Sequence, residues 1–190
     1  MTVEEIFSNI SSHMVKGLMI HTQLADYYDF LGLPGYKRCH EYHALKETCG
    51  YRGINRYFIN HYNKLIPEQK IEDPAIIPES WFRYTRQDVD NNTKRNAIKS
   101  ALDKWVDWEK ETKQLYQEMY SELTSLGEIA GACKVKELIC DVDMELKKAQ
   151  RYQLNKMMTD YDLSGIVSEQ GRKHKKYKKK LAKEIGVHIC

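Results

Sequence analysis

The chain has 190 residues, of which 42% are hydrophobic and 30% are charged, and its formal net charge is only +3. This length suits one well-buried domain, and the composition is typical of amphipathic helices whose charged faces meet water. The uncharged apolar runs are short, so the sequence predicts no membrane span, and it begins without the pattern of a signal peptide.

Residues 3–31 are predicted to form the first helix, because apolar residues recur there at steps of three and four. Thr2 is the expected N-cap. Gly32 is expected to take a left-handed cap conformation, and Pro34 soon after it prevents continuation of the helix. The turn is tight, so the next helix is expected to return antiparallel beside the first.

The second helix is predicted over residues 36–66. Gly50 and Gly53 fall in its interior, where each costs roughly 1 kcal/mol relative to Ala. Either a neighbouring helix approaches closely there, or the helix is broken near residues 50–53. A local kink without a full break is favoured, because the apolar stripe keeps its phase across both glycines.

Residues 67–92 contain three of the four prolines and are predicted to be a connection without a long helix. Such a length is unusual between neighbouring bundle helices and suffices to cross the whole bundle. Trp81, Phe82 and Tyr84 are expected to pin this segment to the bundle surface. An exposed aromatic binding patch is the alternative.

Two further helices are predicted at residues 93–126 and 128–160, separated by a short turn at Gly127. The apolar stripe of the third helix passes through Trp105 and includes one carboxylate, Glu109. No internal repeat is visible. The predicted architecture is therefore all-α, with four long helices joined by a short, a long and a short connection.

The end of the chain is strongly basic. Residues 172–183 carry eight Lys or Arg and no acidic residue, so the rest of the chain is net acidic. We divide the chain into a bundle, 1–165, and a basic C-terminal tail, 166–190, which is expected to be a short helix or an extended arm. Such a density of cations can contact phosphates through counterion release. The predicted nucleic-acid-binding residues are Arg172, Lys173, Lys175, Lys176, Lys178, Lys179, Lys180 and Lys183. A solvated tail, or one that docks on the acidic body or on an acidic protein partner, is the alternative.

Imidazoles and carboxylates on the inner faces of the helices suggest a metal site. His43 and Glu47 are four residues apart and project from one helix face. Oxygen and imidazole donors of this kind suit iron, manganese or zinc. The candidate ligands are Glu47, Glu109, Asp141, Glu145, His43 and His21. Alternatively, Glu47 and Glu109 form structural contacts with His43, Lys or Arg.

The sequence resembles the ferritin-like superfamily over about residues 5–155. Ala25-Asp26-Tyr27-Tyr28, followed by Gly-Leu-Pro-Gly, is similar to the end of the first ferritin helix and its turn. Residues 102–123, with Trp108-Glu109-Lys110 and Thr112 inside them, are similar to the third. The resemblance implies a ferritin-like four-helix bundle with a long crossover between helices two and three.

The resemblance also implies a di-metal site, but only part of its ligand set is present. Glu47 and Glu109 match expected ligands, whereas Met14 stands where a Glu is expected and Gly50 where a His is expected. Asp141 and Glu145 lie near the last acidic ligands of the family. The site is therefore expected to be incomplete.

Three functional hypotheses follow. The first is a ferritin-like bundle with a degenerate metal site that acts by macromolecular binding, through nucleic acid at the basic tail or through a protein partner. DNA-protecting mini-ferritins use lysine-rich arms in this way. The second is an active iron- or manganese-binding protein with an altered ligand set, performing metal oxidation, storage or DNA protection. The third is a small inhibitor or adaptor without metal.

The sequence favours a protein that is not an enzyme, and any activity is expected to be ferroxidase-like metal oxidation. The resemblance also implies a possible homo-oligomer. The five cysteines show no paired metal-type spacing, which favours reduced thiols in a cytoplasmic protein.

Overall fold

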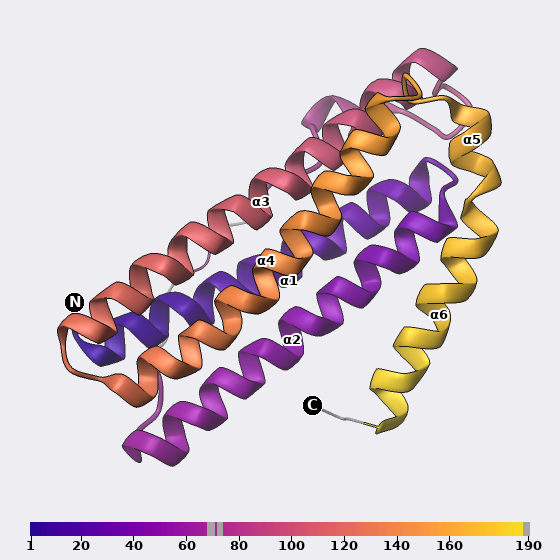
Figure 1. Cartoon of the computed structure of the whole chain (residues 1–190). Coiled ribbons are helices and arrows are strands. Elements are labelled where there is room, and N and C mark those ends of the chain that lie inside the picture. Colours follow the sequence, from indigo (N-terminus) through magenta and orange to yellow (C-terminus); the bar gives the residue numbers. More distant parts are fainter. Residues whose placement is uncertain (68–70, 72–73, 188–190) are drawn as a thin grey trace.

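Four long helices lie side by side in the computed structural model, which describes residues 1–67, 71 and 74–187 (Figure 1). The described helices are α1 (Val3–Phe30), α2 (Pro34–Tyr62), the 3₁₀ helix η1 (Glu79–Arg83), α3 (Asn91–Ser125), α4 (Ile129–Met157), α5 (Leu163–Ser168) and α6 (Gln170–Val187). The predicted boundaries of the four long helices are correct to within four residues.

The first turn forms for the reasons expected from the sequence. The Thr2 side chain accepts a hydrogen bond from the Glu5 backbone N–H, and the Glu5 side chain accepts one from the Thr2 backbone, which completes a capping box. Gly32 takes the predicted left-handed conformation with φ of 72°. α2 is one unbroken helix through Gly50 and Gly53.

The connection between α2 and α3 lets these two helices run parallel, as Figure 1 shows. Trp81 packs edge-on against Tyr27 and Phe30 of α1, with ring centroids 5.1 and 6.0 Å away. Phe82, by contrast, is 74% exposed, so the prediction that it pins the segment is wrong. One aromatic side chain, Trp81, anchors the segment to α1.

The order of the helices and their connections confirm the predicted all-α four-helix bundle with a long crossover and a C-terminal basic helix. Its interior contains two apolar clusters. One gathers around Trp105 and Tyr28, and the other around Phe7 and Phe58. The buried imidazole and carboxylate groups described below add a polar centre to this otherwise apolar interior.

α6 runs along α2 on the outside of the bundle (Figure 1). Tyr177 is completely buried and Lys173 is 5% exposed, so one face of this basic helix packs against the bundle. The suggested boundary between residues 165 and 166 falls inside α5. The division into a bundle and a tail stays a prediction.

Among the described residues, no helix combines the length and apolar character needed to cross a bilayer. Cys39, Cys133 and Cys140 carry free thiols, as expected. Cys49 is disulfide-bonded, so the expectation of a reduced thiol is wrong at that position. Cys190 lies outside the described residues.

Candidate metal centre

A cavity of about 100 Å³ lies among α1, α2, α3 and α4. Five of the six candidate ligands line this cavity: His43, Glu47, Glu109, Asp141 and Glu145. Glu109 is 5% exposed, whereas Asp141 is exposed to solvent. The bundle thus brings together side chains that are far apart in the sequence.

The sixth candidate, His21 on α1, completes a tighter group with His43 and Glu109. Each of the three residues offers one ligand atom, and these atoms all lie within 4.8 Å of one another. His21 Nε2 is 4.0 Å from Glu109 Oε1. All three residues are buried. Two imidazoles and one carboxylate from three helices therefore surround one point.

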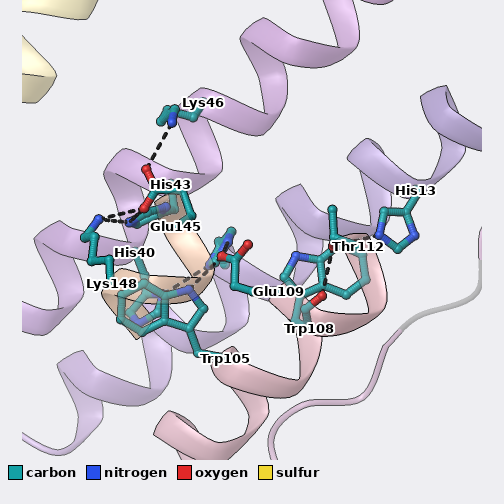
Figure 2. A network of polar contacts seen from close by, with 11 residues as sticks. His13, His40, His43, Lys46, Trp105, Trp108, Glu109, Thr112, Glu145 and Lys148 are labelled. Atoms are coloured by element: carbon teal, nitrogen blue, oxygen red, sulfur yellow. Dashed lines mark hydrogen bonds and ion pairs between the residues drawn. The ribbon is translucent and has the colours of Figure 1, made fainter. Parts of the chain in front are cut away.

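Two neighbouring side chains hold this group in place. His40 Nδ1 lies 3.1 Å from His21 Nδ1, which leaves His21 Nε2 facing Glu109. The Trp105 indole N–H donates a 2.8 Å hydrogen bond to Glu109 Oε1 (Figure 2). Contacts of this kind fix the orientation of metal ligands. His40 was not among the candidate residues, although it lies three positions before His43 and shares its helix face.

Burial keeps the imidazoles neutral. It lowers the pKa of His21 to about 3, with a smaller contribution from the charge of Lys148. Burial also lowers the pKa of His43 well below its usual value, and Lys148 acts in the same direction. A histidine must be neutral to donate its lone pair to a metal. Both imidazoles are therefore in the ligating form at neutral pH.

The pKa values of two buried carboxyl groups, those of Glu47 and Glu109, are raised. Burial raises the pKa of Glu47 to about 8, and the nearby charge of Glu109 raises it further. Burial also raises the pKa of Glu109 to about 7, against the effect of the Trp105 hydrogen bond. Without a cation, Glu47 is mostly protonated at neutral pH and Glu109 is about half protonated.

Two lysines, one on α2 and one on α4, pair with Glu145 beside the cavity. Lys148 Nζ lies 2.6 Å from His43 Nε2 and 3.0 Å from Glu145 Oε2, while Lys46 Nζ lies 3.0 Å from Glu145 Oε1 (Figure 2). Burial alone would raise the pKa of Glu145, but the two lysines hold it below its usual range. Glu145 is thus already neutralised, and Lys148 occupies the lone pair of His43.

Met14 and Gly50, where the resemblance implies two metal ligands, are in contact with each other. A Cβ atom on Gly50 would lie 3.3 Å from both Sδ and Cε of Met14, which is 3% exposed. A thioether in contact with bare backbone offers no hard oxygen or imidazole donor. Met14 and Gly50 therefore supply neither of the two ligands that the resemblance implies at these positions.

Gly17 permits a close approach on the other side of Glu47. A Cβ atom there would lie 2.8 Å from Glu47 Cδ and 3.0 Å from Trp108 Cζ2. The Glu47 side chain therefore packs directly on the α1 backbone. One turn before Gly17 on α1, His13 stacks on Trp108 at 4.1 Å and lies 2.8 Å from Thr112 Oγ1, outside the candidate ligand group.

The eight basic residues of the C-terminal segment divide between two environments. Six of them are exposed: Arg172, Lys175, Lys176, Lys178, Lys179 and Lys183. Lys173 lies between the rings of Tyr36 and Tyr152, 3.7 and 3.9 Å from their centroids. Lys180 lies 4.8 Å from the Tyr42 ring centroid. Lys173 and Lys180 therefore face the bundle.

No protein-family model matches the sequence, and no curated protein sequence matches it. Solved structures do match. An engineered closed form of Archaeoglobus fulgidus ferritin superimposes with a TM-score of 0.75 at 11% identity, covering 92% of this chain and 96% of that one. A humanized archaeal ferritin gives 0.75 at 13% identity, covering 90% and 94%. A PmFTN variant soaked in iron gives 0.71 at 10% identity, covering 88% and 95%. The helix order, the long crossover and these superpositions together show that the chain has the ferritin-like fold.

Proposed function

We propose that this protein binds a divalent transition metal ion, with iron as the first candidate, at His21, His43 and Glu109. The observation that carries the proposal is the convergence of these three buried donors from three helices. Two imidazoles and one carboxylate form a ligand set that suits non-haem Fe(II). The iron-soaked PmFTN variant among the similar structures supports iron as the first ion to test.

The donor chemistry of the site fits such an ion. The imidazoles are neutral, His40 and Trp105 orient the ligands, and Glu47 and Glu145 line the adjoining cavity. Bound iron would supply one-electron redox chemistry inside the bundle. The chain itself supplies the ligands, their orientation and the exclusion of bulk water.

Lys148 opposes the binding of a cation. Its ammonium group lies 2.6 Å from His43 Nε2, so a metal can bind that nitrogen only if the lysine moves away. Lys148 is partly exposed and has room to do so, since it also lines the groove between α4 and α6. We therefore expect this lysine to weaken metal affinity.

Anaerobic titration with Fe²⁺, and with Co²⁺ as a spectroscopic probe, tests the proposal. Wild-type protein is expected to show saturable binding. His21→Ala should weaken it at least about tenfold, because loss of even an outer partner of a metal ligand costs 10- to 100-fold. Lys148→Met should strengthen binding, since it removes the competing charge.

His61→Ala is the matched control, because His61 is an exposed histidine on α2 whose removal should leave affinity unchanged. Absence of saturable binding, or equal affinity of wild type and His21→Ala, would contradict the proposal.

A second candidate function is binding to the nucleic-acid backbone. Arg172, Lys176, Lys179 and Lys183 follow one another at steps of three and four, and Lys175 lies one turn from both Arg172 and Lys179, so these exposed cations share one side of α6. If this side of α6 binds DNA, a short duplex should be retarded at low salt, and Lys175→Gln with Lys179→Gln should weaken retardation. Unchanged retardation of that variant would count against this function.

A further inference from the structure

A second recess lies outside the metal centre, in the groove between α4 and α6. Its volume is about 430 Å³. The charged side chains that line it are Lys148, Arg151, Lys156, Arg172, Lys173 and Lys176, with Glu169 as the one carboxylate among the described lining residues. Six cations thus face one carboxylate across a concave surface.

That carboxylate neutralises only part of the charge. Glu169 Oε1 lies 2.7 Å from Lys156 Nζ and 3.1 Å from Lys173 Nζ. Lys148 is paired with Glu145 at 3.0 Å. Within the described part of the chain, Arg151, Arg172 and Lys176 form no ion pair with a carboxylate. Three cations of the groove therefore lack an anionic partner.

The wall of the groove is preorganised. Lys173 is 5% exposed and is held between the rings of Tyr36 and Tyr152, so its charge has a fixed position. Burial lowers its pKa to about 8, although Glu169 acts in the opposite direction. Asn155 and Tyr152 add neutral polar groups to the lining. The groove thus combines one donor in a fixed position, Lys173, with exposed donors whose side chains can move.

We propose that the groove between α4 and α6 binds a phosphate group, either as free inorganic phosphate or as part of a small phosphate ester. The planar guanidinium groups of Arg151 and Arg172 match the tetrahedral oxygens of phosphate in bidentate geometry. Attraction in a partly enclosed recess is less screened by salt than attraction at an open surface. This proposal does not depend on whether the interior site binds metal.

Isothermal titration of the full chain tests the proposal, with inorganic phosphate in one arm and adenosine monophosphate in the other, at a salt concentration of about 0.15 M. Saturable binding is expected. The groove variant Arg151→Gln with Arg172→Gln should weaken it at least about tenfold, because two charge-assisted donors are lost. Tighter binding of the nucleotide would identify a phosphate ester as the ligand. Tighter binding of inorganic phosphate would identify the free ion as the ligand.

The control variant is Lys175→Gln with Lys179→Gln, which removes the same charge from exposed positions outside the groove. It should retain phosphate affinity within about twofold, because only diffuse attraction is lost. All four side chains are exposed, and unchanged circular dichroism would verify the fold. Absence of saturable binding, or equal weakening in the two double variants, would overturn the proposal.

Discussion

Glu47→Gln should stabilise the metal-free protein by roughly 2 to 3 kcal/mol more at about pH 9 than at about pH 6. The pKa of Glu47 is raised from 4.5 to about 8 in the folded state. Between these values the folded chain holds a proton that the unfolded chain has released. Wild-type stability must therefore fall as pH rises through this window. Glutamine removes the part of this dependence that comes from Glu47, while the part from Glu109 remains in both proteins.

Urea unfolding at both pH values, in the presence of a chelator, measures the effect. Glu118→Gln is the matched control, since Glu118 is an exposed residue of α3 and its substitution should have little effect at either pH. Burial lowers the pKa of His21 to about 3, so folding stability also falls as pH drops below about 6.5. Wild type and Glu47→Gln share this effect, so it cancels in the difference between them. If Glu47→Gln gives the same difference at both pH values, the carboxyl group is not held in a desolvated site.

Tyr177→Ala should destabilise the protein by about 3 to 5 kcal/mol, the usual cost of removing a fully buried aromatic side chain. Tyr177 is 0% exposed, and its hydroxyl lies 3.5 Å from that of Tyr152. Its ring lies 5.9 Å from the ring of Tyr42 on α2. These contacts hold the basic helix on the bundle, so the variant should also expose α6 to faster proteolysis.

Tyr177→Phe separates packing from hydrogen bonding. It keeps the ring and should cost no more than about 1.5 kcal/mol, the usual value of one hydrogen bond. Urea unfolding of both variants provides the measurement. A loss of less than about 1 kcal/mol in Tyr177→Ala would show that α6 is not a tightly packed part of the fold.

Local sequence signals were sufficient to predict the bundle. The capping box at Thr2 and the left-handed turn at Gly32 depend on a few neighbouring residues. The stripe through Trp105 and Glu109 follows directly from helical periodicity, and both side chains are buried as predicted. The connection rich in proline marks the crossover because proline removes backbone donors and ends helices.

The packing of α6 was less predictable. Lys173 and Tyr177 stand in a segment so rich in lysine that it reads as solvated. They are buried because aromatic rings of α2 and α4 surround them, which is a property of the assembled bundle. Likewise, the contact of Lys148 with His43 joins residues 105 positions apart, and no local pattern specifies it.

The sequence proposed six candidate ligands, whose role in metal binding stays a prediction. The sequence identified the candidate ligands and the gaps at Met14 and Gly50. It did not indicate that His21, His43 and Glu109 form the tightest group, because that depends on how three helices pack. The neutralisation of Glu145 by Lys46 and Lys148 depends on the same packing.

An anomalous-scattering measurement on crystals soaked anaerobically in Fe²⁺ tests the central claim most directly. A metal peak is expected in the bundle interior, about 2.0 to 2.3 Å from a nitrogen of His21, a nitrogen of His43 and an oxygen of Glu109. Lys148 should have moved away from His43. A peak centred between Glu47 and the Met14–Gly50 contact, or peaks confined to the protein surface, would contradict the assignment.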